Sequence, residues 1–448
     1  MPRLISGEWT ATMNLTEPQA GSDLNALRTK AVPQADGSYR ITGTKIFITY
    51  GEHDMADNIV HLVLARLPDA PPGTKGISLF LVPKILVNED GSLGKPNDVK
   101  CTGIEHKLGI HGSPTCVMSY GEQEGGAVGW LVGQENAGLA CMFTMMNNAR
   151  LSVGIQAVAV AEAATQHAIA YANERRQGRR PGAGRGAEMV PIIEHPDVRR
   201  MLLSMRARTA ACRMICYAAA GAIDRAHYGR DEEARKQARM RADLLTPLAK
   251  AYSSDSAVEV ASLGVQVHGG MGFIEETGAA QYYRDSRIAP IYEGTNGIQA
   301  IDLVTRKLPM DGGAAVKAFI SEMRETAKEA RQVNRADFGR MGECLEEAID
   351  ALEEATGHLA AIGAEEVDKA LAVATPYLAL MSATAGSAYL ARAALGATAQ
   401  EENPVTTSHI ALARFFAENI LPETAALKRV VLQGADSLLD APASALSA

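Results

Sequence analysis

The sequence predicts a multidomain α+β protein with a small β-barrel domain, then a helical bundle, then an appended C-terminal helical domain. Short strand-like runs with frequent turns fill residues from about 8 to 125. From about residue 135, apolar residues recur at helical steps of three and four. A turn at Asp311-Gly312-Gly313 separates a further Ala- and Leu-rich region. We therefore place the domains at residues 1–130, 131–310 and 311–448.

The β domain is inferred from the polarity of short runs. Residues 39–49 alternate in the manner of a half-buried strand, whereas 58–65 and 76–83 are apolar or β-branched runs. Turn-forming clusters of Pro, Asn, Asp and Gly separate these runs at 68–73 and 88–91. Short strands with turns at this frequency are typical of a small barrel or sandwich.

The helical regions follow from periodicity. Between Leu202 and Ile223, residues at steps of three and four are apolar except for Thr209, so they share one helical face. A loop rich in Gly, Pro and Arg at 177–191 precedes this helix. Together these features predict a bundle, and we expect the small polar tail at 441–448 to fray. Further helices are expected at about 138–173, 232–268, 275–308, 314–334, 338–363, 366–397 and 408–433.

The composition bounds the function without specifying it. The 448 residues are 47% hydrophobic and 21% charged, which describes an ordinary globular protein. A net charge of −8 argues against a general affinity for nucleic acid or anionic membranes. Six scattered cysteines without CxxC pairs indicate reduced thiols. Because neither a signal peptide nor an apolar run of membrane length is visible, we expect a cytoplasmic location.

The stretch Tyr292-Glu293-Gly294-Thr295-Asn296 is the first candidate site. It follows an apolar run, and apolar surroundings that exclude water raise the pKa of a carboxyl toward neutrality. A carboxylate tuned in this way suits abstraction of a weakly acidic carbon-bound proton. Gly294 leaves room for a close approach to the backbone. Taken alone, a Tyr-Glu-Gly tripeptide is more often an ordinary turn.

A second stretch, Met13 to Asp23, passes from a short apolar strand through a Pro turn to Ala20, Gly21 and Ser22. Such a loop exposes backbone N–H groups and hydroxyls that can bind a pyrophosphate or flavin ring oxygens. A capped β-turn is the simpler interpretation of this stretch alone. Together, the two stretches resemble the acyl-CoA dehydrogenase family. In that family the loop binds flavin and the glutamate removes the substrate α-proton.

The resemblance implies an FAD site built from several segments. The strand that ends at Gly51 would lie against the flavin, with Phe47 stacked on the ring and Thr49 near the nitrogen that accepts hydride. Many relatives have Trp at the position of Phe47, which leaves the route of electrons to a partner protein open. The implied cofactor-binding residues are Met13, Leu15, Thr16, Gly21, Ser22, Phe47, Thr49, Arg175, Gln177, Gln266, Gly269, Gly270, Thr295 and Asn296.

Two of these segments would contact the FAD of a neighbouring subunit, so a homodimer or homotetramer is implied. The turn from Gln266 to Gly270 would lie against the ADP part, although it could also be a plain helix C-cap. His268 within it is taken as structural, because no second His lies at metal-ligand spacing. Arg175 and Gln177 would bind the pyrophosphate. They belong to a basic cluster that continues to Arg185 and could instead be a solvated loop.

The implied substrate is an acyl-CoA thioester. Its carbonyl would accept hydrogen bonds from the Glu293 backbone N–H and a flavin ribityl hydroxyl. Glu293 would take the α-proton while a β-hydride passes to flavin N5, which gives a trans-2-enoyl-CoA. The electrons would go on to electron-transfer flavoprotein or a similar acceptor. Many relatives carry an acid at the position of Asn147, and His111 could be a surface residue. The implied substrate-binding residues are Ser22, Ser113, Asn147, Arg150, Tyr292 and Gly294.

The resemblance covers residues from about 8 to 310. With the appended domain, it favours the branch that includes 3-methylmercaptopropionyl-CoA and long-chain acyl-CoA dehydrogenases. Family members begin with an all-helical domain that closes one side of the acyl pocket, and this chain starts a dozen residues before the flavin loop. A fragment, a mis-assigned start or a true truncation would each explain the difference. We expect weaker FAD binding than in full-length relatives, and low or no turnover.

Three alternatives remain open at this point. The basic cluster around Arg175 would suit a nucleic-acid binder of the same superfamily, against which stand the net charge and an intact Glu293. A non-catalytic helical scaffold would lack a flavin spectrum. An acyl-CoA oxidase would pass its electrons to oxygen and produce peroxide.

Overall fold

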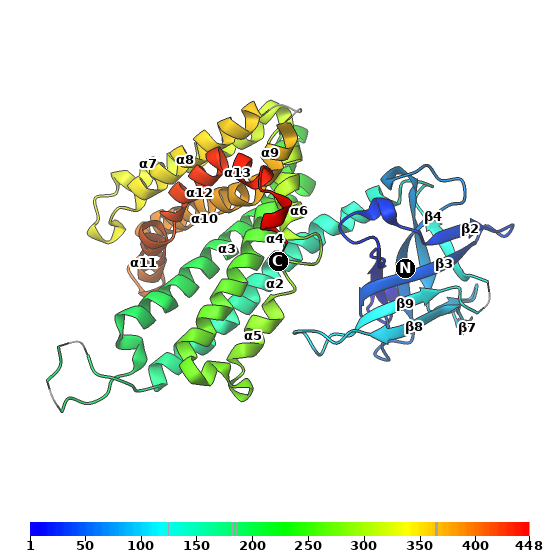
Figure 1. Cartoon of the computed structure of the whole chain (residues 1–448), viewed down its shortest axis with the longest axis horizontal. Helices are drawn as coiled ribbons and strands as arrows, with labels where there is room; N and C mark the ends of the chain where they lie inside the picture. The colour runs from blue at the N-terminus through cyan, green and yellow to red at the C-terminus, as the bar shows by residue number, and fades with distance from the viewer. Residues whose placement is uncertain (124, 181, 185, 363–365, 448) are drawn as a thin grey trace. The chain divides into compact units, whose positions relative to one another are not determined.

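The computed structural model describes residues 1–123, 125–180, 182–184, 186–362 and 366–447. Its contacts divide the chain into two compact units, Met1–Asn148 and Ala149–Ala448. Strands build the first unit and helices the second (Figure 1). The predicted succession of a β-barrel, a helical bundle and an appended helical region is confirmed. Domain boundaries at residues 130 and 310 stay a prediction.

The first unit contains an eight-stranded sheet that closes on itself. Along the sheet, hydrogen-bonded strands follow the order β1, β4, β5, β10, β3, β9 and β8. In addition, β2 pairs with both β3 and β4. That double pairing joins β2, β3, β10, β5 and β4 into a small closed ring around buried apolar side chains. The strands are β1 (Thr10–Asn14), β2 (Lys30–Pro33), β3 (Tyr39–Thr49), β4 (Ile59–Arg66), β5 (Ile77–Pro83), β6 (Ile85–Val87), β7 (Leu93–Pro96), β8 (Val99–Ile104), β9 (Thr115–Tyr120) and β10 (Ala127–Val132).

Helices dominate the rest of the chain, and their bounds agree with the periodicity in most places. Among the described residues, no helix has both the length and the apolar character that crossing a membrane requires. The helices are α1 (Pro2–Ile5), α2 (Gly138–Glu174), α3 (Pro196–Tyr228), α4 (Glu232–His268), α5 (Ala279–Ser286), α6 (Asn296–Asp302), α7 (Ala314–Gln332), α8 (Met341–Ala361), α9 (Val367–Ala372), α10 (Ala374–Thr398), α11 (Pro404–Asn419), α12 (Glu423–Gln433) and α13 (Ala435–Leu439).

Three predicted helices are shorter than expected. The run at 275–308 is wrong as one helix, because a loop around Pro290 and Gly294 separates α5 from α6. The run at 408–433 is two helices, α11 and α12, with Pro422 at the start of the second. The run at 366–397 breaks between α9 and α10. In the tail at 441–447, one short turn forms at Ala443–Ala445 and the side chains are exposed.

The appended helices share one hydrophobic core with the bundle. Side chains of α3, α4, α7, α8, α10, α11 and α12 belong to the same buried cluster. The Ala-rich helix α10 packs on α3, and a Cβ added at Gly386 would lie only 3.0 Å from the Cβ of Ala211. Small residues therefore allow a close approach of these two helices, and the bundle and appended region form one compact unit.

The end of β3 departs from a regular strand. Its register with β9 shifts between Lys45 and Ile48, and Phe47 and Tyr50 have φ values of 60° and 52°. Left-handed backbone is uncommon outside glycine, so the surroundings must impose it. The ring of Phe47 is 58% exposed, whereas Lys45 is fully buried. Strict alternation along residues 39–49 would place Lys45 and Phe47 on the same face, and the bulge separates them.

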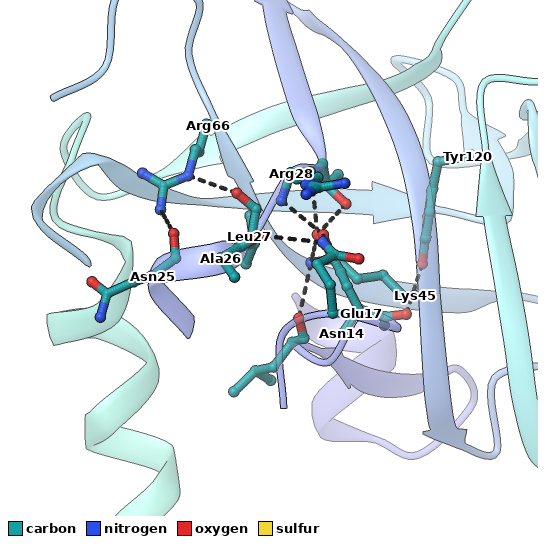
Figure 2. A network of polar contacts seen from close by, with 12 residues as sticks. Asn14, Glu17, Asn25, Ala26, Leu27, Arg28, Lys45, Arg66 and Tyr120 are labelled. Atoms are coloured by element: carbon teal, nitrogen blue, oxygen red, sulfur yellow. Dashed lines mark hydrogen bonds and ion pairs between the residues drawn. The ribbon is translucent and has the colours of Figure 1, made fainter. Parts of the chain in front are cut away.

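Lys45 is buried because it holds the loop that follows β1. Its ammonium donates to Glu17 Oε1 at 2.9 Å and to the carbonyl of Leu15 at 3.0 Å. The Glu17 carboxylate also accepts the backbone N–H groups of Arg28, at 2.7 Å, and Thr29, at 3.0 Å. In Figure 2, dashed lines meet at the carboxylate of Glu17, among them those from Lys45 and from Arg28. The loop is thereby tied to β3 and to the segment before β2.

The network keeps both groups charged near neutral pH. Burial alone would raise the pKa of Glu17, but Lys45 and the hydrogen bonds from Thr29 and Arg28 outweigh it and lower the pKa to about 2. Burial lowers the pKa of Lys45 to about 8, against the opposing effect of Glu17. A buried ion pair of this kind costs desolvation, and removal of one partner leaves an uncompensated charge.

Lys45→Met should destabilise the first unit by about 3–5 kcal/mol, because it leaves the carboxylate of Glu17 buried without its counter-ion. Trp9 and Trp130 both lie in the first unit, so tryptophan fluorescence during urea unfolding at pH 7 reports on it. Lys100→Met, at an exposed lysine of β8, is the control and should change stability by less than about 0.5 kcal/mol. Equal unfolding midpoints for Lys45→Met and the unmodified chain would contradict this role.

Acid should weaken the same network. The pKa of Glu17 is lower in the folded state than the ordinary value of 4.5, so its ionisation stabilises the fold above pH 4.5 and that stabilisation is lost as the pH falls toward 2. The difference in unfolding free energy between the unmodified chain and Glu17→Gln should therefore shrink by about 3 kcal/mol across this range. A difference that stays constant from pH 5 to pH 2 would rule out the ionised pair as its source.

Candidate active site

Glu293 lies in a tight loop between α5 and α6. The N–H groups of Ile291 and Tyr292 both donate to the carbonyl of Ile288, at 2.9 and 3.1 Å, and the N–H of Asn296 donates to that of Pro290 at 3.0 Å. These hydrogen bonds close the loop from both ends. They hold Glu293 at φ 57°, in the left-handed region that residues with a side chain rarely adopt.

Gly294 extends this strained turn and is the position where glycine is required. Its φ is 84°, and an added Cβ would approach Gln299 Nε2 to 2.9 Å. Thr295 then caps α6, with its hydroxyl accepting the N–H of Ile298 at 3.2 Å. The hydroxyl of Tyr292 donates to Gln156 Oε1 of α2. The structure therefore has a turn where the expected helix at 275–308 would have continued, and the partners of this turn on other helices were not visible in the sequence.

The positive charges of two buried side chains, Arg150 and Lys250, act on the carboxyl of Glu293. Burial raises the pKa of Glu293, and the positive charges of Arg150 and Lys250 oppose that rise without cancelling it. Burial also lowers the pKa of Lys250 to about 8, and it lowers the pKa of Arg150 despite the nearby carboxylates of Asp302 and Glu293. The predicted direction of the Glu293 pKa shift is confirmed. Such a carboxyl suits general-base chemistry, because ionisation leaves it more basic than an exposed carboxylate.

Several buried polar atoms near Glu293 have no hydrogen-bond partner within the described residues. They include both side-chain amide atoms of Gln299, whose residue is fully buried, and Nε of Arg150. Buried polar groups are normally satisfied in folded proteins. Buried donors without a partner beside a half-buried carboxylate therefore fit a site that binds a polar ligand.

The predicted flavin segments of the first unit come together around β3. Two contacts hold the loop at Leu15 and Thr16 beside β3. One is the ion pair of Lys45 with Glu17, and the other is the hydrogen bond from the N–H of Ile46 to the Thr16 carbonyl at 3.0 Å. The same strand carries Phe47 and Thr49. Met13 and Leu15 are partly buried in a second apolar cluster of this unit. Gly21 and Ser22 are exposed, and an added Cβ at Gly21 would meet no atom within 4 Å. These exposed donors and an exposed aromatic ring fit the chemistry of a flavin.

Ser113 lies near the same strand end. Thr49 pairs with Thr115 across β3 and β9, and the N–H of Tyr50 donates to the carbonyl of Pro114 at 2.8 Å. The Ser113 carbonyl accepts a hydrogen bond from the ammonium of Lys107 at 2.7 Å. Nε2 of His111 lies 2.8 Å from the Lys107 carbonyl, so the imidazole stabilises its own turn. Of the predicted substrate residues on α2, Asn147 is exposed and Arg150 is buried.

The predicted dinucleotide segments of the second unit also lie together. The ring of Tyr171, one turn before Arg175, stacks on His268 with centroids 4.5 Å apart. Gln266, Gly269 and Gly270 at the end of α4 are exposed, and neither glycine would meet an atom within 4 Å of an added Cβ. His268 is buried and bonds the Gly264 carbonyl at 2.7 Å, which supports its structural role.

The basic cluster is partly neutralised by its own surroundings. Arg180 forms an ion pair with Glu194, and Arg176 donates to the carbonyl of Met189 at 3.2 Å. Arg175 Nη2 is 3.4 Å from Gln177 Oε1, so these two predicted ligands are neighbours. Arg185 lies outside the described residues. No group of three or more His, Cys, Asp or Glu among the described residues could hold a metal ion.

Sequence reasoning missed Lys250, Gln299 and the Glu17–Lys45 pair. Lys250 could have been noticed as a lone lysine in the apolar run of α4 from Leu244 to Tyr252. A cavity of about 700 Å³ lies elsewhere in the second unit, against side chains of α3, α4, α7 and α10, and none of the predicted site residues lines it.

Three family models match the chain in succession. Acyl-CoA dehydrogenase, middle domain, matches residues 12–122, and Acyl-CoA dehydrogenase, C-terminal domain, matches residues 136–308. Acetyl-CoA dehydrogenase C-terminal like matches residues 319–442. The predicted family and its appended region are thereby confirmed.

Individual relatives agree with these matches. The 3-methylmercaptopropionyl-CoA dehydrogenase of Ruegeria pomeroyi is 49% identical over 98% of this chain and 74% of its own length. A butyryl-CoA dehydrogenase of Syntrophomonas wolfei is 45% identical over 72% of this chain, which spans about half, 54%, of that relative. The structure of an acyl-CoA dehydrogenase complexed with FAD from Bacillus anthracis shares the fold, at 24% identity and a TM-score of 0.77, over 97% of this chain and 70% of that one.

From this identity and coverage, the chain belongs to the acyl-CoA dehydrogenase family, whose members are flavin oxidoreductases that act on CH–CH donors.

Proposed function

We propose that this protein removes hydrogen from the α and β carbons of an acyl-CoA thioester and forms a trans-2-enoyl-CoA, with Glu293 as the base. The observation that carries the proposal is a half-buried carboxyl in a strained loop, under the influence of two buried cations. A base of this kind suits an α-proton made weakly acidic by the thioester carbonyl. The membership of the family supports the same reaction class.

The loop at 13–22 and the end of β3 would hold the cofactor FAD. Phe47 offers an exposed ring, Thr49 an exposed hydroxyl, and Gly21 an open backbone approach. When bound, FAD would supply the hydride acceptor and with it the redox chemistry. The Glu17–Lys45 pair does not contact the ligand in this proposal, but it fixes the loop that does.

The chain's own contribution to the reaction is alignment and electrostatics. The N–H of Glu293 would donate to the thioester carbonyl, which gains negative charge as the α-proton leaves. The Glu293 carboxylate takes that proton and becomes neutral, while Arg150 and Lys250 remain as fixed positive charges nearby. Tyr292 and Gly294 would border the thioester. Asn147 and Ser113 would contact the CoA part.

Two residues proposed for the cofactor already have partners in the protein. The Thr295 hydroxyl caps α6, and the Asn296 side chain is bonded to α4. Their role toward FAD would therefore rest on the backbone or on indirect support. Arg175, Gln177, Gln266, Gly269 and Gly270 would serve the FAD of a second subunit, so a homodimer or homotetramer belongs to the proposal.

The electron acceptor proposed is electron-transfer flavoprotein or a similar protein. An oxidase would instead release peroxide in air without any added acceptor. The nucleic-acid alternative has less support, because Arg176 and Arg180 of the basic cluster are engaged within the protein. An anaerobic titration with saturated acyl-CoAs, including 3-methylmercaptopropionyl-CoA and butyryl-CoA, would test cofactor, reaction and substrate together by the bleaching of flavin absorbance.

Glu293→Gln should retain FAD but lose about 10²- to 10⁴-fold in the rate of flavin reduction by an acyl-CoA, because the amide cannot accept the α-proton. Anaerobic stopped-flow absorbance measures that rate, and the flavin-to-protein absorbance ratio measures cofactor content. Glu232→Gln, at an exposed carboxylate in the first turn of α4, is the control and should be reduced normally. Normal bleaching of Glu293→Gln would refute the assignment of the base.

The rate of flavin reduction should rise with pH as Glu293 ionises. Because burial raises its pKa, the midpoint of this rise should lie above 4.5, the ordinary value for a glutamate. Below the midpoint the carboxyl is protonated and cannot act as a base. Rates measured at saturating substrate from pH 5 to pH 9 would show this rise as the acidic limb of the pH profile. A rate that does not change with pH in the unmodified protein would contradict a titrating base of raised pKa.

A further inference from the structure

Lys250 is a fully buried lysine on α4 with a direct contact to the Glu293 loop. Its residue has no exposed surface, and Leu248, Ala249 and Ala251 beside it are equally buried. Its ammonium donates to Asn296 Oδ1 at 2.8 Å. A buried ammonium is costly unless it is bonded, so this contact must be maintained in the fold.

Asn296 uses its whole side chain to attach the start of α6 to α4. Its Nδ2 group donates to the Ala251 carbonyl at 3.1 Å and to Asp255 Oδ1 at 2.8 Å, while Oδ1 accepts from Lys250. Ser254 also lies within hydrogen-bond distance of this amide, at 3.0 Å from Nδ2. Because Asn296 follows Glu293 by three residues, α4 sets the position of the strained loop.

The charges around Glu293 come from several elements. Arg150 of α2 and Lys250 of α4 act on Glu293 directly. Asp255 of α4 faces Lys250 and is itself influenced by Arg287, whereas Asp302 of α6 and Arg306 after it act on Arg150. The phenol of Tyr292 is the remaining titratable neighbour.

We propose that Lys250 is a positioning residue for the reaction: through Asn296 it anchors the Glu293 loop, and its buried positive charge favours the ionised form of the Glu293 carboxyl. This inference rests on the proposed function, since it assigns a role within that site. It differs from a structural role because it predicts an effect on the titration of Glu293. Burial alone would leave the carboxyl more strongly protonated than it is with the two cations present.

Lys250→Met tests both parts. Methionine is unbranched and similar in length to lysine, so it can fill the same apolar surroundings and we expect the variant to fold. We expect faster amide hydrogen exchange in residues 292–298 and a shift of Glu293 protonation to higher pH. Flavin reduction at pH 7 should fall between about tenfold and about a hundredfold, with its pH limb displaced in the same direction.

Two of these measurements need neither substrate nor turnover. Hydrogen exchange followed by mass spectrometry reports on the loop. Labelling by a carbodiimide and an amine, which requires a protonated carboxyl, reports on Glu293 when the modified peptide is quantified over a pH series. Lys236→Met, which removes an exposed lysine from the same helix, is the matched control and should leave exchange, labelling and reduction unchanged.

The outcomes separate this proposal from the proposed function. Lys250→Met with unchanged labelling and unchanged exchange would overturn the role of Lys250, even if the unmodified protein is reduced by an acyl-CoA. A lower rate at every pH with an unshifted limb would also overturn it and leave a structural role only. An unmodified protein that no acyl-CoA reduces would count against the proposed function, while exchange and labelling still decide the role of Lys250.

A second variant covers the case in which Lys250→Met does not fold. Asn296→Ala removes the acceptor of the ammonium, so Lys250 should lose its proton more readily and the loop should lose its anchor. Faster exchange in residues 292–298 and a shift of Glu293 labelling to higher pH would support the proposal. An exchange pattern and a labelling curve identical to those of the unmodified protein would overturn it.

Discussion

A lysine ammonium removed from water must be bonded inside the protein, and this constraint shapes one loop in each of the two units. Lys45 in the first unit bonds Glu17 and the Leu15 carbonyl, so the proposed flavin loop has one position. Lys250 in the second unit bonds Asn296, so the Glu293 loop has one position. Each lysine can stay buried only while its loop keeps that conformation. The energetic cost of burying each charge therefore favours one loop conformation over the alternatives.

Backbone strain is found where these anchors act. Phe47 and Tyr50 at the end of β3, and Glu293 before α6, adopt left-handed conformations that cost energy for residues with a side chain. Such conformations persist only where the surrounding structure over-determines them. In the first unit the bulge beside Lys45 provides this support, and in the second the cap of Thr295 and the bonds of Asn296 do. Strain and buried charge therefore occur together at the residues proposed to meet cofactor and substrate.

The appended helices contribute to the second unit through its core. Helix α10 packs on α3 through small residues, and α7, α8, α11 and α12 extend the same buried cluster. The helices α3 and α4 therefore gain an apolar partner on a face that a bundle alone would leave open. Since α4 carries Lys250 and Asp255, the rigidity of the Glu293 loop depends on packing as well as on hydrogen bonds.

Sequence patterns alone predicted the class of fold, which is confirmed, and the segments proposed for the site, which stay a prediction. Alternation located β3, helical periodicity located α3 and α4, and the residues around Glu293 and Gly21 indicated the family. Local patterns suffice there, because the period of a strand or helix reflects which face is buried. The sequence did not reveal the bulge in β3 or the break before α6. Contacts with distant parts of the fold, and not local propensity, set the conformation of Phe47 and of the loop before α6.

The partners of the buried charges became visible only once the chain was folded. Lys45 and Glu17 are 28 residues apart, and Lys250 and Asn296 are 46 residues apart, so no local pattern relates them. The raised pKa of Glu293 was foreseen from its apolar flanks, but the cations of Arg150 and Lys250 that moderate it were not. Electrostatic interactions depend on distance in space and on exclusion of water, and both are set by how α2, α4 and α6 pack.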